Sequence, residues 1–498
     1  MLDLTRRALL RRSILGTLAM GGASVLPRSA WATGWGDIPA GVWPAAYQPK
    51  KVLEIFCYSG MSPWETFWVS EDTAATKNWR NFQADVQGLH WHCAPDSASP
   101  SDETNSFATD QGGTPVFWGP STKPLWRADI FGRARMVTIA HDLQPHEAAT
   151  PLALTGHRLG NPRLAGKGAA IQHRQISLMP RAVPYSFVLV PDDIGGFQFA
   201  QVAAVTNGMH PGYAVPMLIK IGDSSFQTLL QRSQMTSEAD HLIATYQGMY
   251  RDRLRFQGMG DAIRSAGFTS YDTAVNFLLN ADQLDTLLGG SVLTVGNGRI
   301  CGTDDPAEPA QAPNKTATAL EVATLLLTTG QAAYVGVLDG GVTRVAGTPY
   351  DTHYPHHVET VSSNMFNLCR NLAAQIDAAD PTKLNLDDVL IVIHSEFGRT
   401  PTVGGLTGRD HWPYGYVAIL IGGPIASRGI EGHLDGASSM PNAGNDYSPT
   451  DVHGAVLLAA GIDPFASENF GVQEFTTNVN DGTEQGTRLN LKTKILGA

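Results

Sequence analysis

The sequence contains few cysteines and none of the motifs that would give them a chemical role. Four cysteines occur in 498 residues, far apart and without a CxxC pair, at Cys57, Cys93, Cys301 and Cys369. This spacing excludes a CxxCH haem attachment site. Three disulfide pairings are open to four cysteines, and the sequence selects none of them. A chain of this length forms a large core without disulfides.

Long apolar runs, internal repeats and nucleotide-binding loops are also absent. No later stretch approaches the ~20 apolar residues that a membrane-spanning helix needs, so we expect no integral membrane segment. No period of about 20–50 residues recurs, which argues against a solenoid. No GxGxxG follows an expected strand, and a redox or nucleotide-cofactor enzyme therefore has little support.

Positive charge is scarce once the N-terminus is set aside. The formal net charge is −11, and residues 1–32 hold five arginines and one aspartate, so the remaining chain carries about −15. This acidity argues against nucleic acid or an anionic membrane surface as the main partner, because both are negatively charged.

The N-terminus has the order of a removable export signal. Arg6 and Arg7 precede an uncharged stretch over residues 14–26, and the small-residue cleavage pattern Ala30-Trp-Ala32 follows. The paired arginines and the weak hydrophobicity predict the twin-arginine route. We therefore expect the twin-arginine translocase as a partner during export, and a periplasmic or extracellular protein. The alternative is an uncleaved N-terminal helix on a cytosolic protein.

Short apolar runs alternate with helical patterns along the rest of the chain. The expected strands cover residues 51–58, 135–140, 185–190, 332–338, 389–394 and 416–421. The expected helices include residues 316–329, 358–378 and 448–460. This alternation predicts an α/β fold with a largely parallel central sheet sandwiched by helices. After the signal at 1–32 we expect one domain over 33–498, with a mainly helical insertion at about 225–315.

Acidic and imidazole side chains follow or border several of these strands, where ligands bind in open α/β sheets. Asp351 and His353 flank one residue, so both can point the same way in an extended segment. Glu396 is the second residue after an expected strand, and Asp410 and His411 precede another. Carboxylate oxygens and imidazole nitrogens are usual ligands of zinc and manganese, so this clustering predicts a divalent-metal site. Solvated loop residues are the alternative.

Four further residues are candidates for binding or catalysis. The planar guanidinium of Arg399 suits an oxyanion such as phosphate or sulfate, although a salt bridge with Glu396 is the alternative. Ser62 could be a nucleophile near a metal and Glu65 a metal ligand, but Ser-Pro is equally a turn signal. His146 could bind a metal, orient a bound anion or simply border a pocket.

These motifs resemble those of the DUF1501 family. Asp351-Thr-His353 and Ser395-Glu-Phe-Gly-Arg-Thr400 match its DTH and SEFGRT, and Gly408-Arg-Asp-His411 matches GTDH with Arg409 in place of Thr. The segment from Ser59 to Phe67 is similar to SGGPSxxDTFD, one residue shorter and with Glu65 for Asp. The family comprises exported bacterial proteins, many with twin-arginine signals, and resembles the alkaline phosphatase/sulfatase superfamily.

The resemblance implies an alkaline phosphatase-like fold with a divalent metal, zinc or manganese. Asp351 and His353 stand at the positions of a metal-binding pair, and His411 at that of the last metal histidine. Glu396 replaces an aspartate, whereas Phe397 removes a histidine ligand. A second metal is therefore in doubt unless Asp410 or Glu65 compensates.

The expected function is that of an exported metal-dependent hydrolase or transferase acting on phosphoryl- or sulfuryl-type esters of a small molecule or polymer. Its expected catalytic residues are Ser62 and Arg399, and His146 is expected to bind substrate. The expected metal ligands are Glu65, Asp351, His353, Glu396, Asp410 and His411. The formylglycine signature C-x-P/A-x-R is absent, so a formylglycine-dependent sulfatase is not expected. The alternative is a non-catalytic exported protein of the same fold that binds a surface glycan or a protein partner.

Overall fold

A computed structural model describes most of the chain after residue 36. The described ranges are 37–69, 105–158, 167–176, 186–191, 217–223, 237–256, 287–289, 291–298, 312–342, 349–354, 357–401, 408–435, 447–466 and 470–498. The expected signal at 1–32 lies outside them, as do Cys93 and Cys301. Of the helical insertion expected at about 225–315, the largest described element is helix α9 (Ser237–Phe256). Among the described helices, none has the length and apolar character that crossing a membrane requires.

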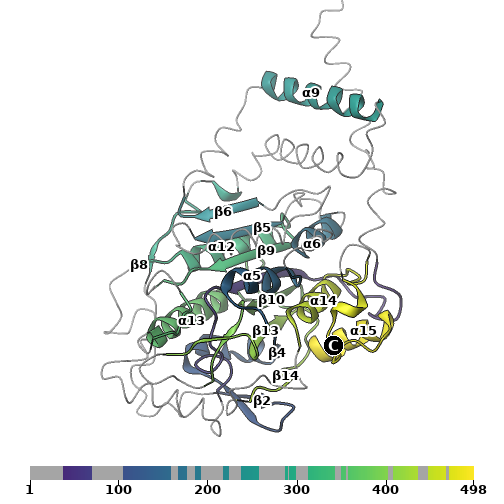
Figure 1. Cartoon of the computed structure of the whole chain (residues 1–498). Helices are drawn as coiled ribbons and strands as arrows, with labels where there is room; N and C mark the ends of the chain where they lie inside the picture. The colour runs from purple at the N-terminus through teal and green to yellow at the C-terminus, as the bar shows by residue number, and fades with distance from the viewer. Residues whose placement is uncertain are drawn as a thin grey trace, which may run out of the picture.

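The core is an eight-stranded sheet with the order β14-β4-β13-β10-β1-β9-β5-β6 (Figure 1). Its strands are β1 (Lys51–Cys57), β4 (Ala134–Ile139), β5 (Phe187–Pro191), β6 (Met217–Ile221), β9 (Tyr334–Asp339), β10 (Val389–His394), β13 (Tyr416–Gly422) and β14 (Gly429–Glu431). All of them run in one direction except β13, which is antiparallel to both β10 and β4. The expected α/β fold with a largely parallel sheet is confirmed. The short edge strands β6 and β14 were not expected from the sequence.

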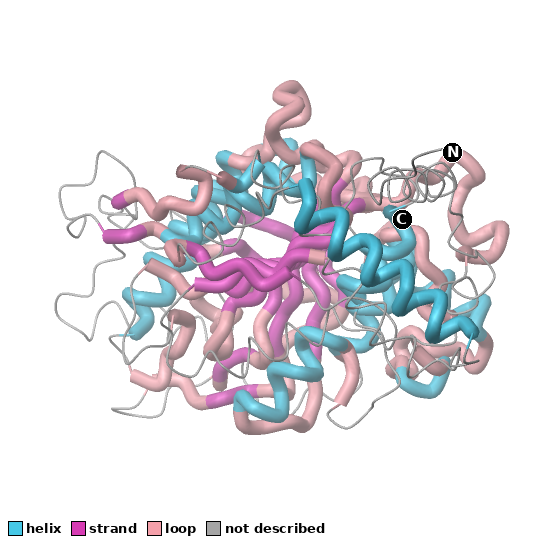
Figure 2. Tube along the Cα trace, turned by 90° about the horizontal axis from the view of Figure 1, so that it is seen from above, coloured by secondary structure: helices cyan, strands magenta, loops and turns pink. Residues whose placement is uncertain are grey.

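Helices cover both faces of the sheet (Figure 2). Leu53 and Ile55 of β1 pack in one core with residues of α12 (Lys315–Thr328) and α13 (His357–Ala374). Val52, on the opposite face of the same strand, packs with residues of α6 (Lys167–Ile176) and α14 (Pro449–Ala459). Burial on both faces explains why the strands are continuously apolar rather than alternating.

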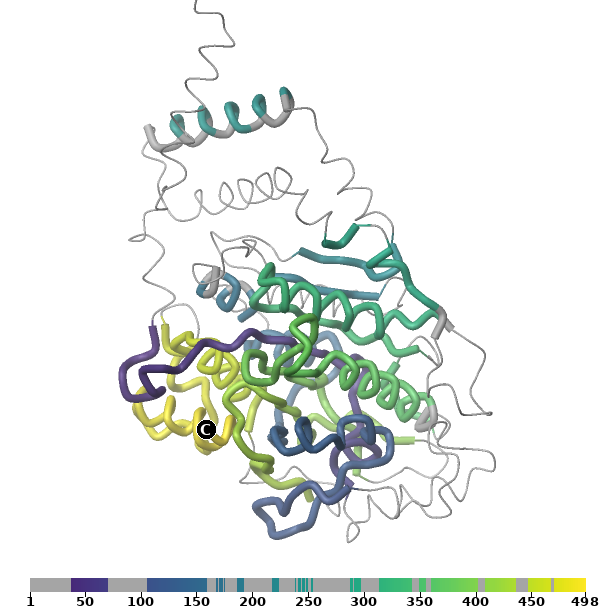
Figure 3. Tube along the Cα trace, turned by 180° about the vertical axis from the view of Figure 1, so that it is seen from behind, coloured from purple at the N-terminus to yellow at the C-terminus, as the bar shows by residue number. Residues whose placement is uncertain are grey.

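Helix α14 begins and ends as the sequence predicts. Its first turn is a capping box, in which the Ser448 side chain accepts from the Asp451 N–H and the Asp451 carboxylate accepts from the Ser448 N–H. Gly461 follows the helix with a φ of +79°, a conformation that glycine adopts without steric cost. Figure 3 shows the N-terminal lead-in beside this C-terminal region, where Tyr47 donates to the Ala459 carbonyl at 2.6 Å.

The direction of β13 determines where the candidate site residues lie. Because β10 ends and β13 begins at the same edge of the sheet, both ends of the connection over 395–415 lie at that edge. The turn after β1, which begins at Tyr58, and the residues after β4 leave the sheet there too. We call this the carboxyl edge. It is the edge at which ligands bind in sheets of this kind.

Candidate metal centre at the carboxyl edge

Backbone pairing brings two distant motifs together at the carboxyl edge. The Gly408 N–H donates to the His353 carbonyl at 2.5 Å, and the Arg409 N–H donates to the Thr352 carbonyl at 2.7 Å. A Cβ at position 408 would collide with the Thr352 carbonyl oxygen and lie 2.8 Å from the Tyr354 nitrogen. Only glycine permits this close approach, which sets the residues after 408 beside His353.

The approach creates a group of three side chains able to hold a metal ion. One ligand atom from each of His353, Asp410 and His411 lies within 4.8 Å of the other two. The rings of His353 and His411 meet edge to face with centroids 4.7 Å apart. The Nε2 atom of His411 is buried and has no hydrogen-bond partner. Two imidazoles and a carboxylate are a usual ligand set for zinc.

The electrostatic surroundings keep His411 uncharged at neutral pH. Burial, followed by the positive charge of Arg399 and the neighbouring His146 and His353, lowers the pKa of His411 to about 4. An imidazole must be neutral to bind a metal. At neutral pH one ring nitrogen of His411 is therefore unprotonated, and a metal ion can bind there without displacing a proton.

Asp351 orients the ring of His353 through contacts with its backbone and with Nδ1. Its carboxylate accepts from the His353 backbone N–H at 2.9 Å and contacts His353 Nδ1. Burial alone would raise the pKa of Asp351, but the hydrogen bond from His353 and the charge of Arg399 hold it well below its usual range. A carboxylate on one ring nitrogen leaves the other free to bind a metal. Here that other nitrogen, Nε2, lies 3.3 Å from Asp410 Oδ1 and 3.4 Å from Arg399 Nη1.

Arg399 is fully buried and its nitrogens all have protein partners. Its Nε donates to the Gly60 carbonyl at 2.9 Å, and its Nη2 contacts the Ser59 carbonyl and lies 2.9 Å from Asp351 Oδ1. Its Nη1 lies 3.0 Å from His353 Nδ1. Arg399 thus pairs with Asp351, and it holds the turn after β1 against the segment that carries His353.

Glu396 belongs to a separate pair beside the three-residue group. Its Oε1 lies 2.6 Å from His146 Nδ1 and accepts from the Ser59 N–H at 2.8 Å. Burial alone would raise the pKa of Glu396, but the hydrogen bond with His146 and the charge of that histidine lower it. The His146 ring lies 4.6 Å from the His411 ring, centroid to centroid, and Phe397 packs 4.4 Å from His411. Glu396 is therefore linked to the three-residue group through His146.

Glu65 belongs to a third, fully buried group. One of its oxygens accepts from the Ser62 hydroxyl, and the other accepts from Arg409 Nε at 2.5 Å. The Nη1 atom of Arg409 donates to the Thr400 and Pro401 carbonyls at 2.8 and 2.7 Å. Two positions at which this chain differs from the family pattern, Glu65 and Arg409, thus pair with each other.

Replacing Arg409 by the threonine of the family pattern is expected to destabilise the protein. Arg409→Thr leaves the Glu65 carboxylate buried without its partner, and breaking such a pair costs about 3–5 kcal/mol. Adding Glu65→Gln should recover at least about 1 kcal/mol of that loss. Urea unfolding of the two single variants and the double variant measures this coupling. Asp387→Asn, which breaks an ion pair whose aspartate is 73% exposed, is the control and should change stability by less than about 1 kcal/mol. Simple additivity would contradict the prediction.

Replacing Gly408 by alanine is expected to separate the two paired segments. The added Cβ would lie 2.7 Å from the His353 carbonyl carbon, so the backbone must move. We expect zinc affinity to fall by about 10–100-fold, as when the groups that orient metal ligands are removed. Competition with a chromogenic chelator measures the affinity. The control is Gly296→Ala, where the new methyl meets open space; equal zinc affinity in both variants would contradict the prediction.

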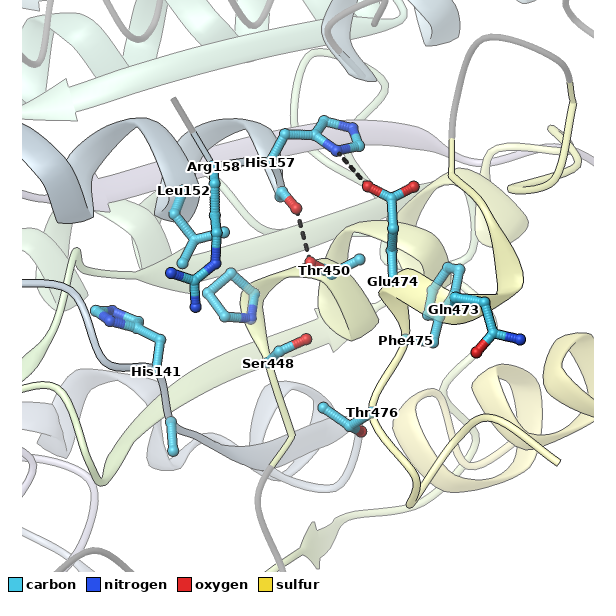
Figure 4. Close-up of a pocket in the computed structure, with 13 residues that line it drawn as sticks. His141, Leu152, His157, Arg158, Ser448, Thr450, Gln473, Glu474, Phe475 and Thr476 are labelled. Atoms are coloured by element: carbon cyan, nitrogen blue, oxygen red, sulfur yellow. Dashed lines mark hydrogen bonds and ion pairs between the residues drawn. The ribbon is translucent and has the colours of Figure 1, made fainter. Parts of the chain in front are cut away.

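A separate cleft is lined by residues that follow β4 and by residues of the C-terminal region (Figure 4), and none of His353, Asp410 and His411 lines it. Its volume is about 650 Å³, and its lining includes His141, His157, Arg158, Ser448, Thr450 and Glu474. Much of the lining is paired within the protein, since His157 lies 3.5 Å from Glu474 and Arg158 pairs with Asp142. The link to the metal candidates is His141, whose Nε2 donates to the Glu396 carbonyl at 2.7 Å. The three-residue group and this cleft are therefore separate features of the structure.

A buried charge network in the core was not anticipated from the sequence. Glu54, on β1, pairs with Lys167 at 2.5 Å and with His394 Nε2 at 2.7 Å, and it accepts from the Tyr334 hydroxyl. All four side chains are nearly inaccessible to solvent. The available signal was one glutamate in the middle of the apolar run KVLEIFC.

The fold is thus an α/β fold with a three-residue metal candidate at the carboxyl edge of a mostly parallel sheet. The sequence profile of the family described as "Protein of unknown function (DUF1501)" matches residues 49–483. The chain belongs to this DUF1501 family, as its DTH and SEFGRT motifs predict. A search of curated proteins finds no match.

Proposed function

We propose that the protein is an exported metal-dependent hydrolase or transferase of phosphoryl- or sulfuryl-type esters, with an alkaline phosphatase-like fold. The observation that carries this proposal is the group of His353, Asp410 and His411, whose ligand atoms converge within 4.8 Å. The buried and unpartnered Nε2 of His411 supports it, because a buried polar atom without a partner is costly unless it binds something.

The donor set fits one zinc or manganese ion. His353 and His411 would bind it through imidazole nitrogens and Asp410 through a carboxylate oxygen. Both oxygens of Glu65 are engaged by Ser62 and Arg409, and Glu396 is held by His146 and the turn after β1. We therefore propose one ion rather than two. When bound, a divalent ion would polarise an ester oxygen and lower the pKa of a water molecule.

The remaining candidate residues have roles that their contacts suggest. The Ser62 hydroxyl is held by Glu65, which would accept its proton if Ser62 acts as the nucleophile. Arg399 would act through its charge and by holding Asp351 and the His353 ring, because its nitrogens are occupied by the protein. His146, bound to Glu396 by one ring nitrogen, would contact the substrate with the other.

Metal analysis and an ester panel together test this function. Protein exported in its native host should contain about one divalent ion per chain and hydrolyse a chromogenic phosphate monoester, phosphodiester or sulfate ester. Chelation should abolish that turnover, and added zinc or manganese should restore it. A folded protein that contains no metal, is unchanged by chelator and turns over none of the esters would end the proposal.

Export by the twin-arginine translocase would suit a protein whose metal ligands come together only when the chain is folded. That route carries folded proteins, so we propose that the metal is loaded in the cytoplasm before export. Replacing the signal at 1–32 by one for the unfolded-chain route should then yield metal-poor or wrongly metallated protein. Fully loaded, native protein from that route would break the link between signal and site.

The rival function is a non-catalytic exported protein that binds a surface glycan or a protein partner. The separate cleft of about 650 Å³ favours it, because none of the three metal candidates lines this cleft. Glycan binding that is lost on replacing Arg158, in a protein with no ester turnover, would select this rival.

A further inference from the structure

Ser59, in the turn that follows β1, has a backbone conformation that serine rarely adopts. Its φ is +88°, and among the described residues it is the one non-glycine residue with a positive φ. A Cβ makes this left-handed region unfavourable, whereas glycine enters it freely. The next residue, Gly60, has a φ of +80° and meets the same demand without strain. Position 59 therefore carries a side chain against the preference of its backbone.

The backbone contacts of Ser59 do not explain why the residue is a serine. Its N–H donates to Glu396 Oε1 at 2.8 Å, and its carbonyl accepts from Arg399 Nη2. A glycine would make both contacts. The Ser59 hydroxyl itself is buried and has no hydrogen-bond partner. A buried hydroxyl without a partner destabilises the fold, so side chain and conformation are both unfavourable at this position.

The two residues that hydrogen-bond to the Ser59 backbone, Glu396 and Arg399, also contact residues of the candidate metal centre. Glu396, which accepts from the Ser59 N–H, also holds His146 at 2.6 Å. Arg399, which donates to the Ser59 carbonyl, lies 2.9 Å from Asp351 and 3.0 Å from His353 Nδ1. Backbone strain and unmet polar groups at such a position are typical of functional sites, where a ligand uses the group.

We propose that the Ser59 hydroxyl hydrogen-bonds to the tetrahedral oxyanion group of the substrate and that serine is retained at this position for that contact. The inference rests on the proposed function and adds a substrate-binding residue to it. A donor that is already desolvated and fixed in place needs no reorganisation when the anion binds. Inorganic phosphate, the simplest tetrahedral oxyanion of the proposed substrate class, is the probe.

Two replacements separate the hydroxyl from the strained backbone. Ser59→Ala removes the hydroxyl and keeps the strain, whereas Ser59→Gly removes both. We expect Ser59→Gly to raise the melting temperature by about 1–3 °C. Both variants should bind phosphate about tenfold or more weakly in the zinc-loaded protein, as for loss of a hydrogen bond to a charged group. Zinc affinity should not change. Calorimetric titration measures both affinities.

Ser363→Ala is the matched control, because the Ser363 hydroxyl is also buried without a partner but lies in α13. It should leave phosphate affinity unchanged. A purely structural Ser59 would alter the melting temperature and leave phosphate affinity intact in both variants, which would overturn this inference and leave the proposed function standing. Wild-type protein that binds zinc but not phosphate would also overturn this inference, whereas the proposed function is decided by the metal analysis and the ester panel.

Discussion

Replacing His411 by alanine is expected to abolish the stabilisation of the protein by zinc. Wild-type protein in zinc at 100 times its dissociation constant should gain about 2.7 kcal/mol of stability, because only the folded state presents the assembled ligands. His411→Ala removes the ligand whose Nε2 is buried, neutral and unpartnered. His353→Ala should have the same effect, and any ester turnover should fall to that of the metal-free protein. Thermal melting with and without zinc measures the shift.

The control for this experiment is a histidine outside the site. His241 is an exposed residue of α9, and His241→Ala should keep the full zinc-dependent shift. Melting without metal and far-ultraviolet circular dichroism show whether the site variants remain folded. A zinc shift of wild-type size in both His353→Ala and His411→Ala would mean that zinc binds elsewhere on the protein.

Replacing Glu54 by glutamine is expected to give a large loss of stability. The change leaves the Lys167 ammonium group without its anionic partner in a nearly inaccessible position. Burial lowers the pKa of Lys167 to about 8, so it is still charged at pH 7. Removing one partner of a buried ion pair costs about 3–5 kcal/mol, a large part of the ~5–15 kcal/mol that a typical protein has. Urea unfolding at pH 7 measures the loss.

Two further variants test whether the loss of stability comes from the unpaired buried charge or from disrupted packing in the core. Glu484→Gln breaks an ion pair whose glutamate is 57% exposed and should cost less than about 1 kcal/mol. Adding Lys167→Met to Glu54→Gln removes the buried ammonium charge that has lost its partner, and it should recover part of the lost stability. If Glu54→Gln were as mild as Glu484→Gln, the buried pair would not stabilise the fold.

The Glu54–Lys167 pair should also make the stability of the protein depend on pH. Burial alone would raise the pKa of Glu54, but the charge of Lys167 and the hydrogen bond from His394 hold it far below the ordinary value of 4.5. A carboxyl group with a depressed folded-state pKa contributes stability above its unfolded pKa, and this contribution is lost as the pH falls toward the folded value. The stability difference between wild type and Glu54→Gln should therefore shrink below pH 4.5.

Local patterns in the sequence were sufficient to predict the layers of the fold. Continuous apolar runs mark strands that are buried on both faces, and β10 has the bounds expected for it, residues 389–394. The capping residue Ser448 and the terminating Gly461 mark the limits of α14 in the same way. The motifs after the strands also sufficed to identify the family.

The sequence by itself determined six of the eight strands of the sheet, the α/β class and the edge at which polar residues gather. Only the tertiary structure decided how those residues pair. It placed β13 antiparallel, set Gly408 against Thr352, and so grouped His411 with His353 while Glu65 paired with Arg409. The physical reason is the distance along the chain over which each effect acts. Periodicity and capping depend on a few neighbouring residues. These contacts instead join segments up to hundreds of residues apart, and they depend on packing and on the register of the backbone. The backbone of Ser59 is likewise held by Glu396 and Arg399, which follow the neighbouring strand β10 although they lie more than 300 residues away along the chain.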